Sequence, residues 1–239
     1  MHHNEKECEC TGDCAENGEC NCKETGDDCC NENNSGVCDC DSDDCCEDNG
    51  ASGCDCDEAD DCCCDGGNIQ VNKPAPGFTL EGIDKEGVKK YGLSDYKGKW
   101  LVLYFYPLDF TFVCPTEVTE FSKRLKEFEK LDTKVLGCST DSVHSHKAWL
   151  KELGDLGYPL LSDMTHEVSK RYQVLLEDEG VAQRGLFIID PEGELRYQVV
   201  HDFDVGRNVD EVLRVLEALQ NGGLCQVGWK PGDKTLKEK

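Results

Sequence analysis

The sequence predicts an α/β domain that follows an N-terminal segment of cysteine-rich, largely irregular structure. The composition changes sharply along the chain, because the first 68 residues hold 16 of the 19 cysteines and almost no residue able to build a core. After that point, apolar runs typical of strands alternate with amphipathic helix patterns, which favours helices packed on a central sheet. About 165 residues are enough for one buried core.

Nearly all of the net charge belongs to the N-terminal segment. Its 68 residues carry 22 acidic side chains, and their only basic side chains are Lys6 and Lys23. The formal net charge of the whole chain is −25. An acidic balance disfavours nucleic acid and anionic membrane as partners, because both attract basic surfaces. The chain has no apolar run of membrane-spanning length and no signal-peptide pattern at its start. We therefore expect a cytoplasmic protein in a reducing compartment.

An imperfect repeat of cysteine pairs runs through residues 1–64, in which Cys-x-Cys pairs are followed by adjacent cysteines. In a reducing compartment such clusters favour metal binding over disulfides. Two pairs together complete a tetrahedral thiolate site, which selects zinc or another soft metal. The pattern resembles metallothioneins in style. The candidate ligands are Cys8, Cys10, Cys14, Cys20, Cys22, Cys29, Cys30, Cys38, Cys40, Cys45, Cys46, Cys54, Cys56, Cys62, Cys63 and Cys64.

Two alternatives remain open for this segment. One is that the segment is an acidic tail with no specific ligand, and the other is that its thiols exchange disulfides. The glycine-containing stretch at 65–70 breaks the cysteine pattern and is typical of a flexible linker. We therefore expect the folded domain to occupy residues 71–239.

The domain centres on the strand and helix that flank Cys114. The apolar and aromatic run at 99–106 predicts a strand buried on both faces. Apolar residues three to four apart predict one amphipathic helix over 116–131, and Pro115 fits its first turn. Cys114 therefore lies where a central strand gives way to the N-terminus of a helix.

The other elements follow in order along the chain. The turn residues within 82–88 predict a strand–turn–strand. We expect Cys138 to be a core thiol. His144 and His146, two positions apart on a helix, point in different directions, and we expect both to face solvent. Strands are predicted at 134–140, 158–163, 183–190 and 195–200, and helices at 142–153, 166–172 and 208–220.

The position of Cys114 favours a reactive thiolate. Unpaired N–H groups and the helix dipole place partial positive charge beside its sulfur. Both stabilise the thiolate, which is the nucleophilic form of cysteine. The alternative is a buried structural cysteine, which is common in protein cores.

The segment around Cys114 resembles a known active-site motif. The pattern Pro107-x-x-x-Thr111-x-x-Cys114 and the run Phe-Thr-Phe-Val-Cys-Pro-Thr-Glu over 110–117 are similar to those of typical two-cysteine peroxiredoxins, the alkyl hydroperoxide reductase/thiol-specific antioxidant family. The similarity extends from about Val71 to Lys234. It implies a thioredoxin-like fold and a peroxidase.

The resemblance also implies the roles of the site residues. Cys114 is expected to be the peroxidatic nucleophile, and Thr111 to bond with the sulfur and the peroxide. Arg184 is expected to hold the thiolate and the peroxide, since a guanidinium is always charged and donates in a fixed fork. Pro107 is expected to shield the site, and Glu117 to orient Arg184.

The resemblance assigns the second redox-active thiol to Cys225, which precedes a Trp-Lys-Pro-Gly run. Cys225 is expected to come from a second subunit and to form an intersubunit disulfide, so the protein is expected to be a homodimer or a ring of five dimers. The implied partners are a hydroperoxide and a thioredoxin-like or flavoprotein reductant, with no cofactor for the peroxidase. Two other hypotheses stay open: a metal-sequestering module whose body supplies oligomerisation, and a holdase chaperone.

Overall fold

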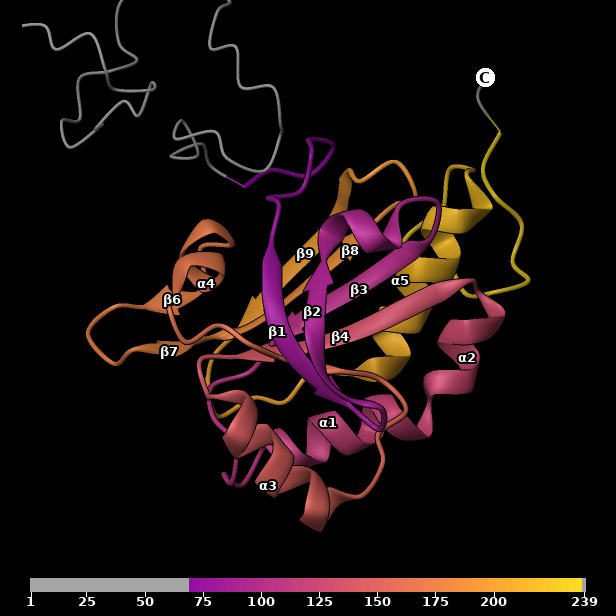
Figure 1. The fold of residues 1–239 in the computed structure, drawn as a ribbon. Helices are drawn as coiled ribbons and strands as arrows, with labels where there is room; N and C mark the ends of the chain where they lie inside the picture. The colour runs from indigo at the N-terminus through magenta and orange to yellow at the C-terminus, as the bar shows by residue number, and fades with distance from the viewer. Residues whose placement is uncertain (1–68, 238–239) are drawn as a thin grey trace, which may run out of the picture. The chain divides into compact units, whose positions relative to one another are not determined.

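A computed structural model describes residues 69–237, which form seven strands in one sheet, a separate two-stranded sheet and five α-helices (Figure 1). The main sheet has the order β2-β1-β5-β4-β3-β8-β9, and β6 pairs with β7. The strands are β1 (Thr79–Asp84), β2 (Gly87–Gly92), β3 (Trp100–Phe105), β4 (Thr133–Ser139), β5 (Leu160–Ser162), β6 (Leu175–Leu176), β7 (Val181–Ala182), β8 (Arg184–Ile189) and β9 (Leu195–His201). The helices are α1 (Cys114–Lys123), α2 (Leu125–Lys130), α3 (Val143–Leu153), α4 (Glu167–Arg171) and α5 (Val209–Asn221), with a short 3-10 helix at Leu93–Tyr96.

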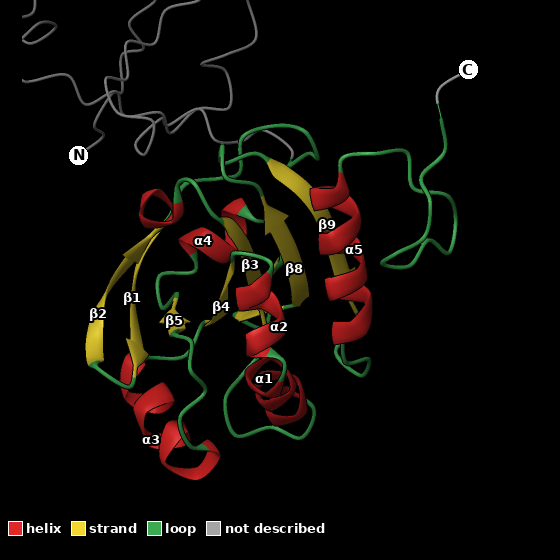
Figure 2. Cartoon of the chain, turned by 90° about the vertical axis from the view of Figure 1, so that its right-hand side faces the viewer, coloured by secondary structure: helices red, strands yellow, loops and turns green. Residues whose placement is uncertain are grey.

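Strand β3 is the centre of the sheet and is buried on both faces, as its apolar run predicts. It pairs in parallel with β4 and antiparallel with β8. Its side chains alternate between two core clusters. Val102 and Tyr104 pack with the helices α1, α2 and α5, whereas Leu101, Leu103 and Phe105 pack with α4 on the other face. Figure 2 shows α5 alongside β8 and β9, on the side where Tyr197 and Val199 of β9 join the first cluster.

The prediction of one helix over 116–131 is wrong, because the segment forms two helices. The backbone at Arg124, with φ −93° and ψ 2°, ends α1 and begins α2. Its guanidinium binds Glu127 of α2 and reaches Asp210 of α5 at 2.6 Å. The contact with Asp210, 86 positions away, helps to hold the bend, and local apolar spacing does not encode it.

The prediction that both histidines of α3 face solvent is wrong for one of them. His144 is exposed, but His146 is fully buried. The cause is tertiary: its two ring nitrogens reach a carboxylate oxygen of Asp109 at 2.8 Å and the carbonyl oxygen of Leu161 at 3.0 Å. Cys138 lies in β4 with no exposed surface, and burial raises the pKa of its thiol well above the ordinary value. It is therefore a core thiol, as predicted.

The described region contains no helix that is both long and apolar enough to cross a membrane.

Candidate active site

Cys114 is the first residue of α1, reached from β3 by a loop over residues 106–113. Val113 occupies the N-cap position without a capping side chain, and Pro115 follows in the first turn. The positive end of the dipole of this ten-residue helix therefore lies beside the sulfur. The side chain of Cys114 has no exposed surface in this chain, so bulk water does not solvate the sulfur.

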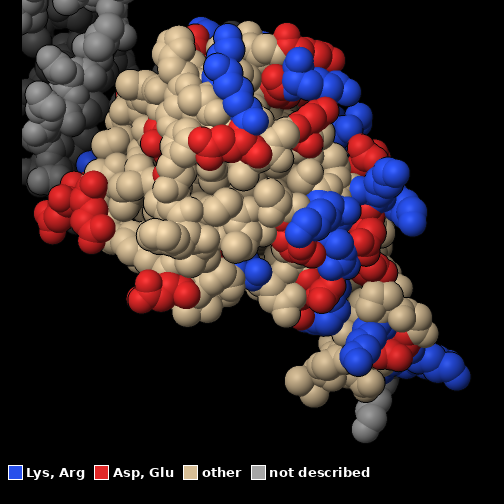
Figure 3. Space-filling model, turned by 90° about the horizontal axis from the view of Figure 1, so that it is seen from below, with Lys and Arg blue, Asp and Glu red and all other residues tan. Residues whose placement is uncertain are grey.

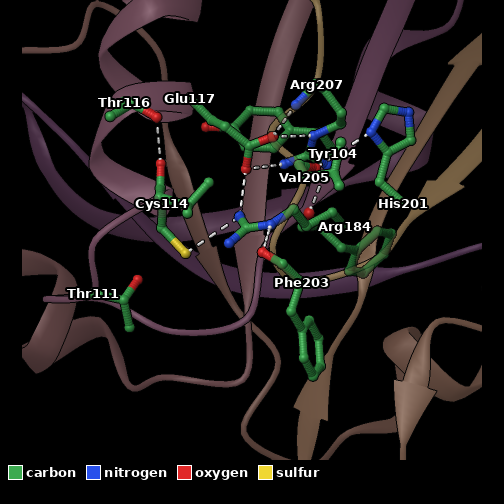
Figure 4. Close-up of polar contacts among 12 residues, drawn as sticks. Tyr104, Thr111, Cys114, Thr116, Glu117, Arg184, His201, Phe203, Val205 and Arg207 are labelled. Atoms are coloured by element: carbon green, nitrogen blue, oxygen red, sulfur yellow. Dashed lines mark hydrogen bonds and ion pairs between the residues drawn. The ribbon is translucent and has the colours of Figure 1, made fainter.

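Arg184 is the charged group beside this sulfur. It begins β8, opposite His201 of β9, and its Nη1 lies 3.5 Å from the Cys114 Sγ (Figure 4). The same Nη1 donates to Glu117 at 2.6 Å, and Nε donates to the carbonyl of Phe203 at 2.7 Å. Three contacts from different parts of the chain therefore fix the planar guanidinium against the sulfur. A positive charge held at this distance stabilises negative charge that develops beside it.

A second guanidinium, that of Arg207, completes the ion network. Its Nε and Nη2 donate to the two carboxylate oxygens of Glu117 at 2.7 and 2.9 Å. Its Nη1 donates to the carbonyls of Phe105 and Gly185, both at 2.7 Å. The guanidinium also lies over the ring of Tyr104, 5.0 Å from the ring centre. Arg207 thus joins the ends of β3 and β8 to the first turn of α1.

The network keeps Glu117 ionised although the residue is buried. Burial opposes the charged form, but the charge and hydrogen bonds of Arg207, with the charge of Arg184, outweigh it and lower the pKa of the carboxyl. Arg207 was not predicted from the sequence as a site residue. One signal was available: a cation immediately before the N-cap residue Asn208 of α5 stands in the unfavourable field of a helix N-terminus, so it needs a partner elsewhere.

The other two predicted loop residues lie on the approach to Cys114. Pro107 is buried at the start of the loop. Thr111 is half-buried, and its hydroxyl donates to the carbonyl of Leu108 at 3.1 Å. The hydroxyl hydrogen is therefore used within the loop, while the oxygen lone pairs stay available as acceptors.

Asp109 anchors this loop from within the core. Its carboxylate accepts from Tyr106 at 2.9 Å and lies 2.8 Å from Nδ1 of His146, and its backbone N–H donates to Asp141 at 2.8 Å. Both ring nitrogens of His146 face oxygen acceptors, because Nε2 meets the carbonyl of Leu161. The buried His146 ring therefore links the Asp109 carboxylate of the loop to the backbone of β5. Neither residue was singled out from the sequence as part of the site.

Cys225 lies away from Cys114 within one chain. Its sulfur lies 3.9 Å from the carbonyl oxygen of Ala218, in the last turns of α5. Arg207 and the ion network lie at the other end of that helix. Ala218 is nine residues after the first residue of α5, or about 14 Å along the axis at 1.5 Å per residue. A disulfide needs Cα atoms within about 7 Å, so this conformation of one chain does not join the two sulfurs.

The candidate metal ligands, all within residues 8–64, lie outside the part of the chain that the structure describes. Within residues 69–237, no group of three or more histidine, cysteine and acidic residues is arranged to hold a metal ion.

A cysteine at a helix N-terminus beside a fixed guanidinium, carried on a mostly antiparallel α/β sheet, defines a thiol-based oxidoreductase. Residues 71–198 match the sequence profile of the AhpC/TSA family. The chain belongs to this family. Its predicted thioredoxin-like fold and its predicted class, a peroxidase of the oxidoreductases, are thereby confirmed.

Named relatives and solved structures agree with this assignment. The chain is 52% identical over 181 residues to Peroxiredoxin-2 of Macaca fascicularis, covering 72% of this chain and 91% of the relative. It is 50% identical over 182 residues to the Thioredoxin peroxidase of Trypanosoma brucei rhodesiense, covering 72% and 92%. The reduced 2-Cys peroxiredoxin of Plasmodium vivax superposes with a TM-score of 0.68 at 38% identity, covering 70% of this chain and 92% of the other.

Proposed function

We propose that this protein reduces hydroperoxides through a Cys114 sulfenic acid, which Cys225 of a second subunit resolves as an intersubunit disulfide. The observation that carries the proposal is the 3.5 Å contact between Arg184 Nη1 and Cys114 Sγ. A guanidinium held there by Glu117 and Phe203 favours the thiolate and remains charged throughout the reaction.

The first step is attack of the Cys114 thiolate on the terminal oxygen of the peroxide. A sulfur–oxygen bond forms as the O–O bond breaks, and the alkoxide or hydroxide that leaves takes up a proton. Arg184 donates toward the oxygen on which charge develops, while Thr111 offers lone pairs to the OH of the peroxide. Pro107 excludes water from one side. The product on Cys114 is a sulfenic acid.

The second step requires another thiol, and two observations favour one from a second copy. Cys225 contacts Ala218 in the last turns of α5, whereas Arg207 and the ion network beside Cys114 lie at the start of that helix, so this conformation of one chain leaves the two sulfurs apart. Strand β9 is an edge strand that pairs with β8 alone among the described strands. Its outer backbone groups are therefore open to pairing with a second copy.

A larger ring is supported by the surface near the site. Figure 3 shows few charged side chains over the centre of the face formed by the lower end of the domain in Figure 1, where α1 and α3 lie. The active-site loop exposes Leu108, Phe110 and Phe112, the last with 97% of its surface accessible. Adjacent exposed apolar side chains of this kind mark protein contacts.

The cycle is completed by a reductant. A thioredoxin-like or flavoprotein dithiol would return two electrons to the disulfide between Cys114 and Cys225.

Single-serine variants test this cycle. Cys114→Ser is expected to abolish peroxide consumption, and Cys225→Ser to stop after one oxidising equivalent per subunit. When the two variants are mixed and exposed to peroxide, non-reducing electrophoresis should show one Cys114–Cys225 bond per heterodimer. A wild-type rate near that of free cysteine, or no covalent dimer in that mixture, would refute the proposal.

For the segment over residues 1–64 we propose thiolate binding of zinc or another soft metal, with residues 65–70 as a linker to the domain at 71–239. The support is the repeated Cys-x-Cys and Cys-Cys spacing alone. A reducing compartment such as the cytoplasm would keep these thiols available. Elemental analysis of the full chain, compared with a variant lacking residues 1–64, tests it: equal metal content in both would count against the proposal.

A further inference from the structure

The described part of the chain holds no third thiol that could reduce the disulfide between Cys114 and Cys225. Its free cysteines are these two and Cys138, and Cys138 has no exposed surface in β4. The other thiols of this chain are the 16 within residues 1–64. Their access to the disulfide is set by the point at which that segment joins the domain.

The N-terminal segment joins the domain at the start of β9. The backbone N–H of Asn72 donates to the carbonyl of Leu195 at 2.7 Å, and a second bond of 2.8 Å runs back from the N–H of Leu195. Leu195 begins β9, whereas His201 ends it and lies opposite Arg184. The segment therefore enters one strand length, about 20 Å, from the end of β9 that adjoins the ion network.

Cys225 lies at the same end of the domain as this entry. Helix α5 begins two residues after Arg207 of the ion network and lies alongside β9 (Figure 2). Its last turns carry Ala218, whose carbonyl oxygen is 3.9 Å from the Cys225 sulfur. Each of these two adjacent elements thus has one end at the ion network. The entry and Cys225 lie at their other ends.

The proposed dimer brings the partner's Cys114 to that end as well. When two copies of β9 pair antiparallel about a two-fold axis, the start of one strand lies opposite the end of the other. The end of β9 adjoins Arg184, which contacts Cys114. The disulfide would therefore form near the entry of the N-terminal segment of the chain that supplies Cys225.

The chain between the entry and the nearest cysteine is long enough to reach the disulfide. Cys64 is eight residues before Asn72, and eight residues span at most about 26–29 Å. Packed layers of secondary structure lie only about 10 Å apart. A tether this short also gives an effective concentration of the order of millimolar.

Charge favours the same encounter. After Cys225 the described chain has three exposed lysines and one acidic residue, namely Lys230, Lys234, Lys237 and Asp233. The sequence over 57–65, around the nearest cysteines, has five acidic residues and no basic one. Opposite charges attract across solvent over a Debye length of about 8–10 Å. The two segments are therefore complementary.

We infer that the cysteines nearest the domain, Cys62, Cys63 and Cys64, are a built-in dithiol reductant of the Cys114–Cys225 disulfide. This inference rests on the proposed function. Adjacent Cα atoms are about 3.8 Å apart, below the range of about 4.4–6.8 Å found in disulfides. The pair that becomes oxidised is therefore Cys62 and Cys64.

The transfer consists of two thiol–disulfide exchanges. The Cys64 thiolate attacks the Cys225 sulfur, so that a Cys64–Cys225 bond forms while the bond to the partner's Cys114 breaks and that sulfur leaves as a thiolate. The Cys62 thiolate then attacks the Cys64 sulfur, and Cys225 leaves as a thiolate. Two thiols of the N-terminal segment thus give up two electrons and two protons. An external dithiol would then reduce the Cys62–Cys64 bond.

The full-length protein tests this without any added reductant. Reduced, metal-free protein receives one equivalent of hydrogen peroxide per subunit, and alkylated samples are analysed by non-reducing electrophoresis and peptide mass spectrometry. We expect the interchain disulfide to form and then to decay as the Cys62–Cys64 bond appears, at a rate independent of protein concentration. A full-length variant with serine at all 16 cysteines of residues 1–64 should keep the interchain disulfide.

A triple variant locates the reductant within the segment. The substitutions Cys62→Ser, Cys63→Ser and Cys64→Ser together leave Cys56 as the nearest thiol, 16 residues before Asn72. Doubling the tether lowers the effective concentration about threefold, since it falls roughly as the −3/2 power of length. The interchain disulfide should therefore decay about threefold more slowly.

Two controls match this variant. The substitutions Cys8→Ser, Cys10→Ser and Cys14→Ser remove the same number of thiols at the far end of the segment, and the decay should stay as in wild type. Cys114→Ser should leave the thiols of the N-terminal segment reduced over the same time, because their electrons reach peroxide only through Cys114.

An interchain disulfide that persists in the wild type as long as in the variant without N-terminal cysteines would overturn the inference. Equal decay in the two triple variants, or a rate proportional to protein concentration, would also overturn it. Failure of both the wild type and the variant without N-terminal cysteines to form the Cys114–Cys225 bond would instead overturn the proposed function, so the two failures are distinguishable.

Discussion

Glu117→Gln removes the carboxylate that two buried guanidiniums share. Glu117 accepts from Arg184 at 2.6 Å and from Arg207 through Nε, Nη2 and the backbone N–H at 2.7, 2.9 and 2.8 Å. The arginine side chains are only 4% and 1% exposed. Removing one member of a buried ion pair costs about 3–5 kcal/mol, because the remaining charge is left uncompensated. For a domain of this size that lowers the melting temperature by roughly 6–20 °C.

The same substitution should slow the reaction with peroxide. The amide of glutamine carries no charge, and its NH2 group cannot accept a bond from a guanidinium. Arg184 therefore loses one of the contacts that hold it against Cys114. We expect the second-order rate constant for hydrogen peroxide to fall about tenfold to a hundredfold, as for other misplaced catalytic groups. Stopped-flow measurement of peroxide consumption, on samples shown to be folded, gives this number.

A matched control exists on the same helix. Glu120 pairs with Lys123 at 3.3 Å, but both side chains are well exposed, at 40% and 68%. Exposed pairs contribute less than about 1 kcal/mol, so Glu120→Gln should leave both the melting temperature and the rate close to wild type. If Glu117→Gln were indistinguishable from this control in both measurements, the argument about the ion network would be wrong.

The stability difference should depend on pH with a definite sign. The folded protein lowers the pKa of Glu117 below its ordinary value of 4.5. Its stabilising contribution is therefore complete above that value and is lost as the pH falls through the lowered pKa of the folded state. The gap in unfolding free energy between wild type and Glu117→Gln should narrow in acid, as measured by urea titrations from pH 7 downward.

Three further substitutions test the rest of the core. Gly137→Ala should cost about 1–3 kcal/mol in urea unfolding, because its Cβ would lie 2.7 Å from the Tyr104 hydroxyl; unchanged stability would contradict that contact. His146→Phe should destabilise by about 1–3 kcal/mol, since it removes a hydrogen-bond partner from the buried Asp109 carboxylate, whereas His144→Phe on the exposed face should change the melting temperature little. Cys138→Ala should keep full peroxidase activity and lose about 1 kcal/mol of stability; a slower peroxide reaction would give that thiol a role it is not assigned here.

The strands and the position of Cys114 could be predicted from the sequence because the signals are local. The apolar run before Cys114 and the helix pattern after it need only neighbouring residues. Arg184 was found through resemblance to a family motif, since a single arginine at the head of an apolar strand has no periodicity. Their juxtaposition follows from sheet pairing, in which β8 lies beside β3.

The features that the sequence analysis missed depend on contacts between distant parts of the chain. Arg207 binds Glu117 across 90 positions, and His146 binds Asp109 across 37. The bend at Arg124 is held partly by Asp210, 86 positions away. Helical and strand periodicity reports which face of an element is buried, but not which buried polar groups meet there.

The supply of Cys225 by a second chain has a genetic consequence under the proposed cycle. Each reaction centre contains residues of two polypeptides. A chain without Cys225 therefore leaves the sulfenic acid on its partner's Cys114 unresolved, whereas its own Cys114 is still resolved by the partner's Cys225. In a cell that makes normal and defective copies in equal amounts, most assembled dimers would then contain at least one idle centre. Substitution of Cys225 in one allele would therefore reduce peroxidase activity even when the other allele is intact.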